Sequence, residues 1–424
     1  MPEECGSEKM NGYKKPMFGV NHDNFGMEWA NSCVGNNGYI DSKQYYDGYI
    51  QASIKLMEVI FTSDDTMSSQ TQYWIDTLIY PICFTLRHSI ETLLKRVSET
   101  VIFISDIRSR GEDISVIQKN ISLHDIKLIW DGLKTIAILN DERYKAPMLK
   151  IEPFVMEIAE IDPTGQTFRY AYSNDSVKHL TDVGIINIAT LYENTCRFHL
   201  DAKELFELSD SLHDEYSLRT FTKKMSRFQL EELSKELPNK SEWSSEYKKK
   251  LQIKHNITSN DLTKALDIIK SHYIFSSYID SEVPLQGIKE CDLFSFIDLW
   301  IRNEKVIRAY NLDETKILTV SEIKKLIAFK KEDLSFLNPD FVAGLFALHY
   351  YMDFSFPEKY VEEYRLKREQ YLEEGTSYKM EDDLNHLLLF KTRLFDVILR
   401  SMKALNQREL ISKLEVRYGF LFPR

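Results

Sequence analysis

Long apolar runs are missing from this sequence of 424 residues. No stretch reaches eighteen apolar residues without a charge, which excludes a helix that crosses a membrane. Residues 1–18 contain no apolar core followed by a small-residue cleavage site, so we expect no secretory signal. These two absences predict a cytoplasmic protein with no membrane partner.

Cysteine is scarce and scattered along the chain. The cysteines are an odd number and form no C-x-x-C pair: Cys5, Cys33, Cys83, Cys196 and Cys291. Disulfide frameworks and zinc sites need closer or paired thiols. The pattern therefore indicates the reduced cytoplasm and predicts no structural metal.

Glycine-rich phosphate-binding motifs are also missing. The sequence has no Gly-Lys-Ser/Thr of a P-loop and no G-x-G-x-x-G. We therefore expect no nucleotide cofactor, and the sequence indicates no cofactor of another kind.

Basic residues are outnumbered by acidic ones, 54 against 65, which gives a formal net charge of −11. A protein whose whole surface binds nucleic acid is normally basic, because Lys and Arg make the phosphate contacts. Any nucleic-acid role of this chain must therefore use a local patch or cleft.

Apolar residues recur at helical spacing over most of the chain, and strand-like alternation is rare. We predict an all-α fold of more than one domain, because the chain exceeds the usual size of one compact core. The predicted parts are an irregular N-terminal arm (1–40), a helical bundle (41–208), a Lys-rich inter-domain region (209–258) and a second helical domain (259–424).

The segment 71–98 is the most informative part of the sequence. It is apolar nearly all round, which is typical of a helix at the centre of a bundle. Pro81 must kink this helix or mark its true start. Arg87, His88 and Glu91 are spaced three and four apart, so they share one face, and Lys95 follows four residues later.

Two further segments carry polar residues of interest. Ser122 is a candidate N-cap for the next helix, with Asp125 at the third helical position and His124 between them. A turn at 162–165 precedes a short segment, expected to be extended, that contains Arg169 and Tyr170.

Residues 84–95 resemble the central helix of the HEPN superfamily, and His124-Asp125-Ile126 resembles the start of the helix that follows it. The segments 46–49, 80–82 and 162–170 resemble uncharacterised bacterial proteins of similar length. The resemblance covers roughly residues 20–200. It implies a HEPN-like helical bundle that acts on RNA as a metal-independent endoribonuclease, in a bacterial toxin or antiphage-defence setting, and a homodimer, because superfamily sites often form at dimer interfaces.

The resemblance and the polar spacing together give two sets of candidate site residues. Cleavage without a metal needs a group that takes the 2′-hydroxyl proton and a cation that stabilises charge on the phosphate. The candidate catalytic residues are Arg87, His88, Glu91 and His124, and the candidate RNA- or nucleotide-binding residues are Lys95, Asp125, Arg169 and Tyr170.

An alternative without catalysis stays open. Ribonuclease members of the superfamily carry an Arg and a His separated by four to six residues, but here His88 directly follows Arg87. The cluster can instead be a paired polar network inside a bundle, Asp125 a helix cap and Arg169 a turn anchor. The chain would then be a helical interaction or nucleotide-binding module, with a protein partner bound through its C-terminal half.

Overall fold

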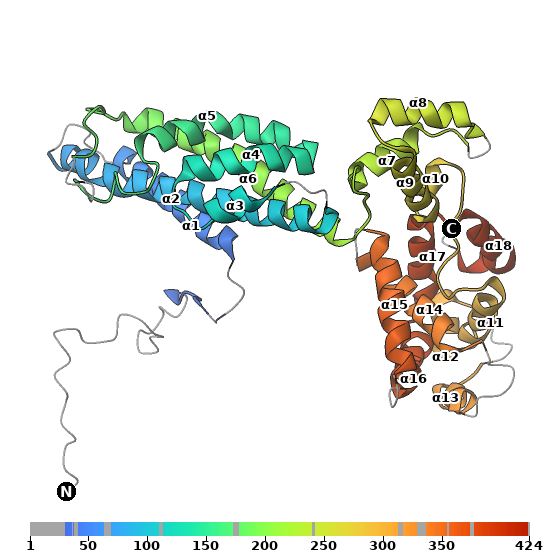
Figure 1. Cartoon of the computed structure of the whole chain (residues 1–424). Coiled ribbons are helices and arrows are strands. Elements are labelled where there is room, and N and C mark those ends of the chain that lie inside the picture. The colour runs from blue at the N-terminus through green and yellow to red at the C-terminus, as the bar shows by residue number, and fades with distance from the viewer. Residues whose placement is uncertain are drawn as a thin grey trace, which may run out of the picture. The chain divides into compact units, whose positions relative to one another are not determined.

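The structure of the chain is a computed structural model. It describes residues 30–35, 37, 41–62, 69–109, 113–172, 178–239, 242–312, 317–328, 336–353, 356–373 and 377–422. These residues form eighteen α-helices with short 3₁₀ turns and one π-helical turn, and two isolated bridges are their only β pairing (Figure 1). The predicted all-α class is therefore confirmed. Most of the predicted N-terminal arm lies outside the described residues.

Two compact units divide the chain. The first contains Met1–Ser98, Lys119–Leu133 and Ala146–Glu204, and the second contains Glu99–Gln118, Lys134–Lys145 and Leu205–Arg424. The helices of the first half of the chain are α1 (Ser42–Phe61), α2 (Ser69–Arg108), α3 (Ser115–Asn120), α4 (Ile126–Asn140), α5 (Lys145–Ile161) and α6 (Ile188–Ser217).

The start of α1 is fixed by a capping box, in which Asp41 accepts from the backbone of Lys43 and the Gln44 side chain accepts from Asp41 N. One face of α1 is buried, and the residues on it recur at helical spacing: Tyr46, Ile50, Ser53, Ile54, Met57 and Ile60. Burial of this face is what holds α1 in the bundle.

The long helix α2 contains Pro81 without interruption. Pro81 therefore does not mark the start of the helix, and α2 also continues ten residues beyond the predicted end at 98. Pro81 is exposed, so solvent can satisfy the carbonyl that it leaves without a donor. From Ile82 onward the helix buries residues around most of its circumference, as its apolar sequence predicts.

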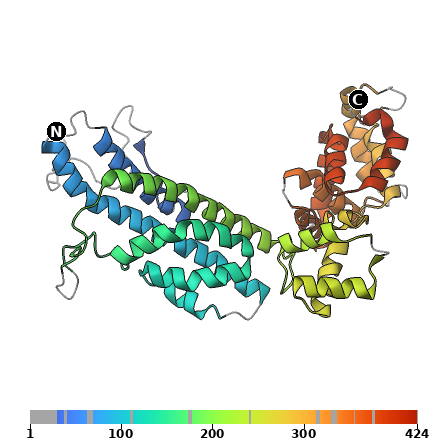
Figure 2. The ribbon, with the colours of Figure 1, turned by 90° about the horizontal axis from the view of Figure 1, so that it is seen from above.

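Helix α6 lies alongside both α1 and α5 (Figure 2). Tyr46 of α1 bonds His199 of α6 at 3.1 Å, and Lys150 of α5 bonds Glu204 of α6 at 2.5 Å. These bonds link helices that are far apart in sequence, so the first unit is a bundle and not a row of hairpins.

The second unit contains the remaining helices: α7 (Arg227–Glu236), α8 (Ser245–His255), α9 (Ser259–Ser271), α10 (Phe275–Tyr278), α11 (Glu290–Trp300), α12 (Glu304–Tyr310), α13 (Val320–Ala328), α14 (Pro339–Tyr350), α15 (Glu358–Leu372), α16 (Ser377–Asn385), α17 (Leu394–Ala404) and α18 (Arg408–Tyr418). At its centre, α14 buries every residue from Phe341 to Leu348. Asn338 caps this helix, and Pro339 occupies its first turn, where the missing N–H of proline costs no helical hydrogen bond.

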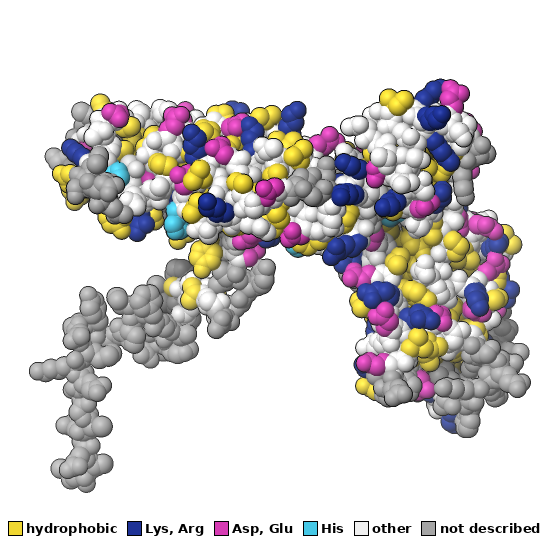
Figure 3. All heavy atoms as spheres, viewed as in Figure 1, with side chains coloured by type: hydrophobic (Ala, Val, Ile, Leu, Met, Phe, Trp, Pro, Cys, Tyr) yellow, Lys and Arg dark blue, Asp and Glu magenta, His cyan; other side chains and the backbone are white. Residues whose placement is uncertain are grey.

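The segment 209–258 forms the end of α6, all of α7 and all of α8. Leu230, Leu233 and Leu251 lie in one hydrophobic cluster with residues of α9 and α10. These apolar side chains, spaced among the lysines, account for the packing of a segment whose composition is polar. On the face shown in Figure 3, basic and acidic side chains are interspersed among the other described residues.

Candidate functional site

Glu91, in the middle of α2, is the hub of a buried polar cluster. Its side chain is 4% exposed. One carboxylate oxygen lies 2.8 Å from Lys95 Nζ and 2.8 Å from His124 Nδ1, and the other accepts a hydrogen bond from Arg87. Direct contacts therefore bring together three of the four candidate catalytic residues, Arg87, Glu91 and His124, and one candidate binding residue, Lys95.

The electrostatics of the cluster keep Glu91 ionised. Burial raises the pKa of Glu91, but the hydrogen bonds from Lys95 and His124 and the charge of Arg87 outweigh it, so the pKa lies below its usual value. An ionised carboxylate only accepts hydrogen bonds. His124 Nδ1 therefore carries the hydrogen of this pair, and Nε2 is the second nitrogen of its ring.

Arg87 is buried and makes hydrogen bonds through all three guanidinium nitrogens. Besides Glu91, it donates to the carbonyl of His124, to that of Pro163 at 2.8 Å and to that of Asp162 at 3.3 Å. These bonds tie α2 to the segment before α4 and to the connection after α5. These bonds use four of the five N–H donors of the guanidinium, which leaves one Nη1 donor beside the pocket.

Gly165 lies against the guanidinium of Arg87. A Cβ at this position would be 3.1 Å from Arg87 Nη1, and the backbone has φ +79°, which L side chains rarely adopt. Both facts require glycine here. The turn predicted at 162–165 is therefore built around the buried arginine.

His88 lies beside the cluster but not within its hydrogen bonds. Its Nδ1 is 3.8 Å from Glu91 Oε2, too long for a hydrogen bond. The ring of Tyr49 meets it edge-on at 4.5 Å, and the ring of Phe84 stacks at 5.9 Å. Burial lowers the pKa of His88, and nearby Arg87 adds to the effect while Glu91 opposes it. The lowered pKa favours the uncharged imidazole at neutral pH.

The predicted cap at Ser122 is wrong. The helix α4 begins at Ile126, and Asp125 Oδ1 accepts a hydrogen bond from Leu128 N at 3.0 Å, whereas the Ser122 hydroxyl donates to the carbonyl of Lys119. A turn between α3 and α4 leaves Ser122 outside the helix. Of the two roles considered for Asp125, ligand binding and helix capping, the structure shows the capping contact.

A pocket of about 430 Å³ opens beside the cluster. It is lined by Phe84, Arg87, His88, Glu91, His124, Thr164, Gly165, Gln166, Arg169, Tyr170 and Tyr172. His124 is the most exposed member of the cluster, with 72% of its side chain accessible. Of the candidate binding residues, Arg169 and Tyr170 line this pocket, whereas Lys95 and Asp125 do not. Lys95 instead contacts Glu91, and Asp125 caps α4.

Arg169 is exposed at this pocket and pairs with no carboxylate among the described residues. Its guanidinium lies 5.6 Å from the ring centre of Phe84 and 5.1 Å from that of Tyr170, and it donates to the Tyr170 hydroxyl at 3.1 Å. Tyr170 is 54% exposed. The predicted extended conformation does not occur here, since residues 167–169 form a turn.

Some pocket residues were not predicted from the sequence. Phe84 lies three and four residues before Arg87 and His88, so helical spacing alone could have found it. Thr164, Gln166 and Tyr172 come from the irregular connection between α5 and α6, where spacing carries no such signal.

The described part of the chain contains neither a metal-ligand cluster nor a membrane-spanning helix. No group of three or more His, Cys, Asp or Glu side chains there is arranged to hold a metal ion. None of the described helices combines the length and the apolar character that crossing a bilayer requires.

Comparisons with known proteins give no relative. No protein-family model, curated protein or solved structure matches the chain. The function must therefore be argued from the site itself.

Proposed function

We propose that this protein binds and cleaves RNA without a metal ion, at the pocket formed by α2, the segment before α4 and the α5–α6 connection. The observation that carries the proposal is the Glu91–His124 pair, a buried carboxylate bound to an imidazole that is exposed at a pocket. A carboxylate in this position fixes the tautomer and orientation of a histidine that acts as a general base.

The reaction follows from this geometry. His124 Nε2 takes the proton of a ribose 2′-hydroxyl, and the 2′-oxygen attacks the adjacent phosphorus. The bond from phosphorus to the 5′-oxygen breaks, and the leaving oxygen takes a proton from water. The hydroxide that remains takes the proton from His124, which restores both the water and the base. The products end in a 2′,3′-cyclic phosphate and a 5′-hydroxyl.

Arg169 supplies the cation that this reaction needs. Its exposed guanidinium at the pocket can stabilise the charge that develops on the phosphate. The exposed ring of Tyr170 beside it offers a surface on which a base can stack. Arg87, which is held by backbone carbonyls, acts by positioning Glu91 and the segment that carries His124.

The resemblance of residues 84–95 to the HEPN central helix supports the same proposal. It supports a role in a bacterial toxin or antiphage-defence setting in the cytoplasm. It also supports a homodimer, because sites of that superfamily often form between two copies.

A non-catalytic function is the second candidate, and the hydrogen bonding of Arg87 favours it. Nearly all the donors of this buried arginine go to groups of the chain itself, as expected of a structural network. In that case the pocket binds a nucleotide or a partner group without transforming it, and the C-terminal helices bind a protein.

Expression in a bacterial host separates the two candidates. We would induce the wild type, His124→Ala and the control His213→Ala, which removes a partly exposed histidine outside the pocket. Growth arrest and fragmented total RNA with the wild type and the control, but not with a folded His124→Ala, are the expected result. RNA cleavage that persists in His124→Ala would contradict the proposal, and no effect of the wild type would favour the binding module.

A further inference from the structure

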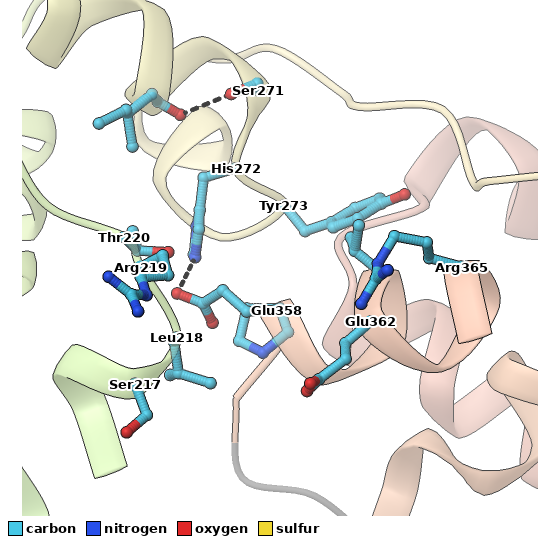
Figure 4. Close-up of a pocket in the computed structure, with 13 residues that line it drawn as sticks. Ser217, Leu218, Arg219, Thr220, Ser271, His272, Tyr273, Glu358, Glu362 and Arg365 are labelled. Carbon is cyan, nitrogen blue, oxygen red and sulfur yellow. Dashed lines mark hydrogen bonds and ion pairs between the residues drawn. The ribbon is translucent and has the colours of Figure 1, made fainter. Parts of the chain in front are cut away.

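A second pocket, of about 460 Å³, lies within the second unit. Its walls come from the connection between α6 and α7, the end of α9 and the start of α15 (Figure 4). Leu218, Ile268, Pro357 and Val361 supply apolar surface to this wall. A cavity of this size and character accommodates a small organic group such as a nucleobase.

The acidic groups of the pocket are compensated by the chain itself. Glu358 Oε1 accepts hydrogen bonds from Arg227 Nε at 2.8 Å and from His272 Nε2 at 3.0 Å. Glu362 pairs with Lys359 at 2.7 Å. No carboxylate that lines the pocket is thus left without a basic or histidine partner.

The basic groups of the pocket are compensated only in part. Arg365 pairs with Glu369 at 3.1 Å, but Arg219 makes no ion pair or side-chain hydrogen bond with any residue that the structure describes. Figure 4 shows Arg219 and Thr220 on the opposite side of the pocket from Tyr273 and Arg365. One uncompensated cation therefore lies at this rim.

Two more cations follow Arg219 along the chain, beyond the residues that line the pocket. Lys223 and Lys224 are exposed and make no salt bridge or side-chain hydrogen bond within the described ranges, while the charge of Lys224 helps to lower the pKa of Asp261 on α9. From Arg219 to Phe228 the sequence carries four basic residues and no acidic one, in a chain of net charge −11. We call Arg219, Lys223 and Lys224 the basic rim.

The backbone that carries the basic rim is held in place. The buried guanidinium of Arg108 bonds the carbonyl oxygens of Thr222 and Lys223 at 3.5 and 3.4 Å. The Thr222 hydroxyl accepts from Met225 N at 2.9 Å, and Ser226 then caps α7. The cations therefore project from an ordered turn rather than from a loose loop.

We propose that this pocket and the basic rim bind single-stranded RNA, with one base in the pocket and the neighbouring phosphates at Arg219, Lys223 and Lys224. Unpaired cations next to an apolar cavity suit a nucleotide unit, in which an apolar base adjoins an anionic phosphate. The inference rests on the proposed function only for the class of ligand. It adds an RNA contact surface in a unit that does not contain His124.

The test measures binding of a short fluorescent single-stranded RNA to the full chain by anisotropy, at several salt concentrations. The full chain would carry His124→Ala, so that no RNA is cleaved during the measurement. The test variant is the triple change R219A/K223A/K224A, and the control is K248A/K249A/K250A on α8, which removes the same charge elsewhere. Circular dichroism checks that both variants are folded.

The rim variant should bind RNA at least about tenfold more weakly and lose about 2 from the slope of log affinity against log salt, since each phosphate contact contributes about 0.7. The control should change neither value by as much. Equal losses in the two triple variants, or no RNA binding by the parent chain, would overturn the inference.

A competition experiment shows whether the site recognises a single nucleotide, with its base in the pocket, or only the phosphate backbone of a longer RNA. A nucleoside monophosphate should displace the RNA from the parent chain, and Val361→Trp, which fills the pocket without changing charge, should abolish this competition. Failure of the monophosphate to compete would overturn the placement of a base in the pocket. A chain that binds RNA through the basic rim but cleaves none would refute the proposed function and leave this inference standing.

Discussion

His124 Nδ1 lies 2.8 Å from Glu91 Oε1, so a single hydrogen bond joins the middle of α2 to the segment just before α4. The carboxylate is buried and the imidazole is exposed, which places the polar cluster at the boundary between the bundle interior and a pocket. Glu91 therefore has two roles: it balances the charge of the buried Arg87, and it orients His124 for the proposed reaction.

Arg87→Met should lower the free energy of unfolding by about 3–5 kcal/mol, since it leaves a buried carboxylate without its arginine and removes the bonds to three carbonyls. Urea unfolding followed by circular dichroism measures the change. As a control, Lys150→Ala removes an exposed pair to Glu204 and should cost no more than about 1 kcal/mol. An equal effect of the two changes would contradict the role of the Arg87 hydrogen bonds in linking α2 to the segment before α4 and to the connection after α5.

Gly165→Ala should destabilise the protein by about 1–3 kcal/mol, because the backbone has φ +79° and the new Cβ would meet the Arg87 guanidinium at 3.1 Å. Gly48→Ala is the matched control. Gly48 lies within α1 with no atom close to an added Cβ, so alanine there should raise stability by about 0.5–1 kcal/mol. Thermal or urea unfolding of both variants shows whether each change raises or lowers the free energy of unfolding. A stabilising Gly165→Ala would contradict this account of the turn.

Much of the cluster could be predicted from sequence because it lies on one helix. The three- and four-residue spacing of Arg87, Glu91 and Lys95 fixes their common face wherever the helix forms. The carbonyl partners of Arg87 could not be predicted, because the oxygens of Pro163 and Asp162 that it bonds belong to the backbone. Every residue has such an oxygen, so residue type does not reveal which ones accept a hydrogen bond. Their contribution depends on tertiary packing.

The limits of the helices show where sequence patterns fail. The prediction ended α2 at 98, but the helix and its buried stripe continue through Val101 and Ile104. The pocket of the second unit draws its walls from three segments far apart in sequence, so no local pattern could indicate it.

Glu358→Gln tests the buried ion pair of the second unit through pH. Burial raises the pKa of Glu358, but His272 and Arg227 lower it to about 2, from 4.5 in the unfolded chain. The unfolded chain therefore binds more protons between these values, so the stability that Glu358 contributes is complete above about pH 4.5 and is lost as the pH falls towards 2. At neutral pH this stability is about 3 kcal/mol by linkage.

The glutamine variant should accordingly be less stable than the wild type at pH 7, and the difference should shrink as the pH falls from 4.5 towards 2. Urea unfolding across this range measures it. A difference that is independent of pH would mean that the ionisation of Glu358 does not stabilise the fold.

The most direct test of the central claim is cleavage of a labelled single-stranded RNA by the purified full chain in the presence of a chelator. The wild type should produce fragments that end in a 2′,3′-cyclic phosphate, and a folded His124→Ala should lose this activity by about 100-fold or more, the usual contribution of a general base. Cleavage by His124→Ala at the wild-type rate would contradict the assignment of His124 as the base, and fragments formed only when a metal ion is added would contradict the metal-independent mechanism.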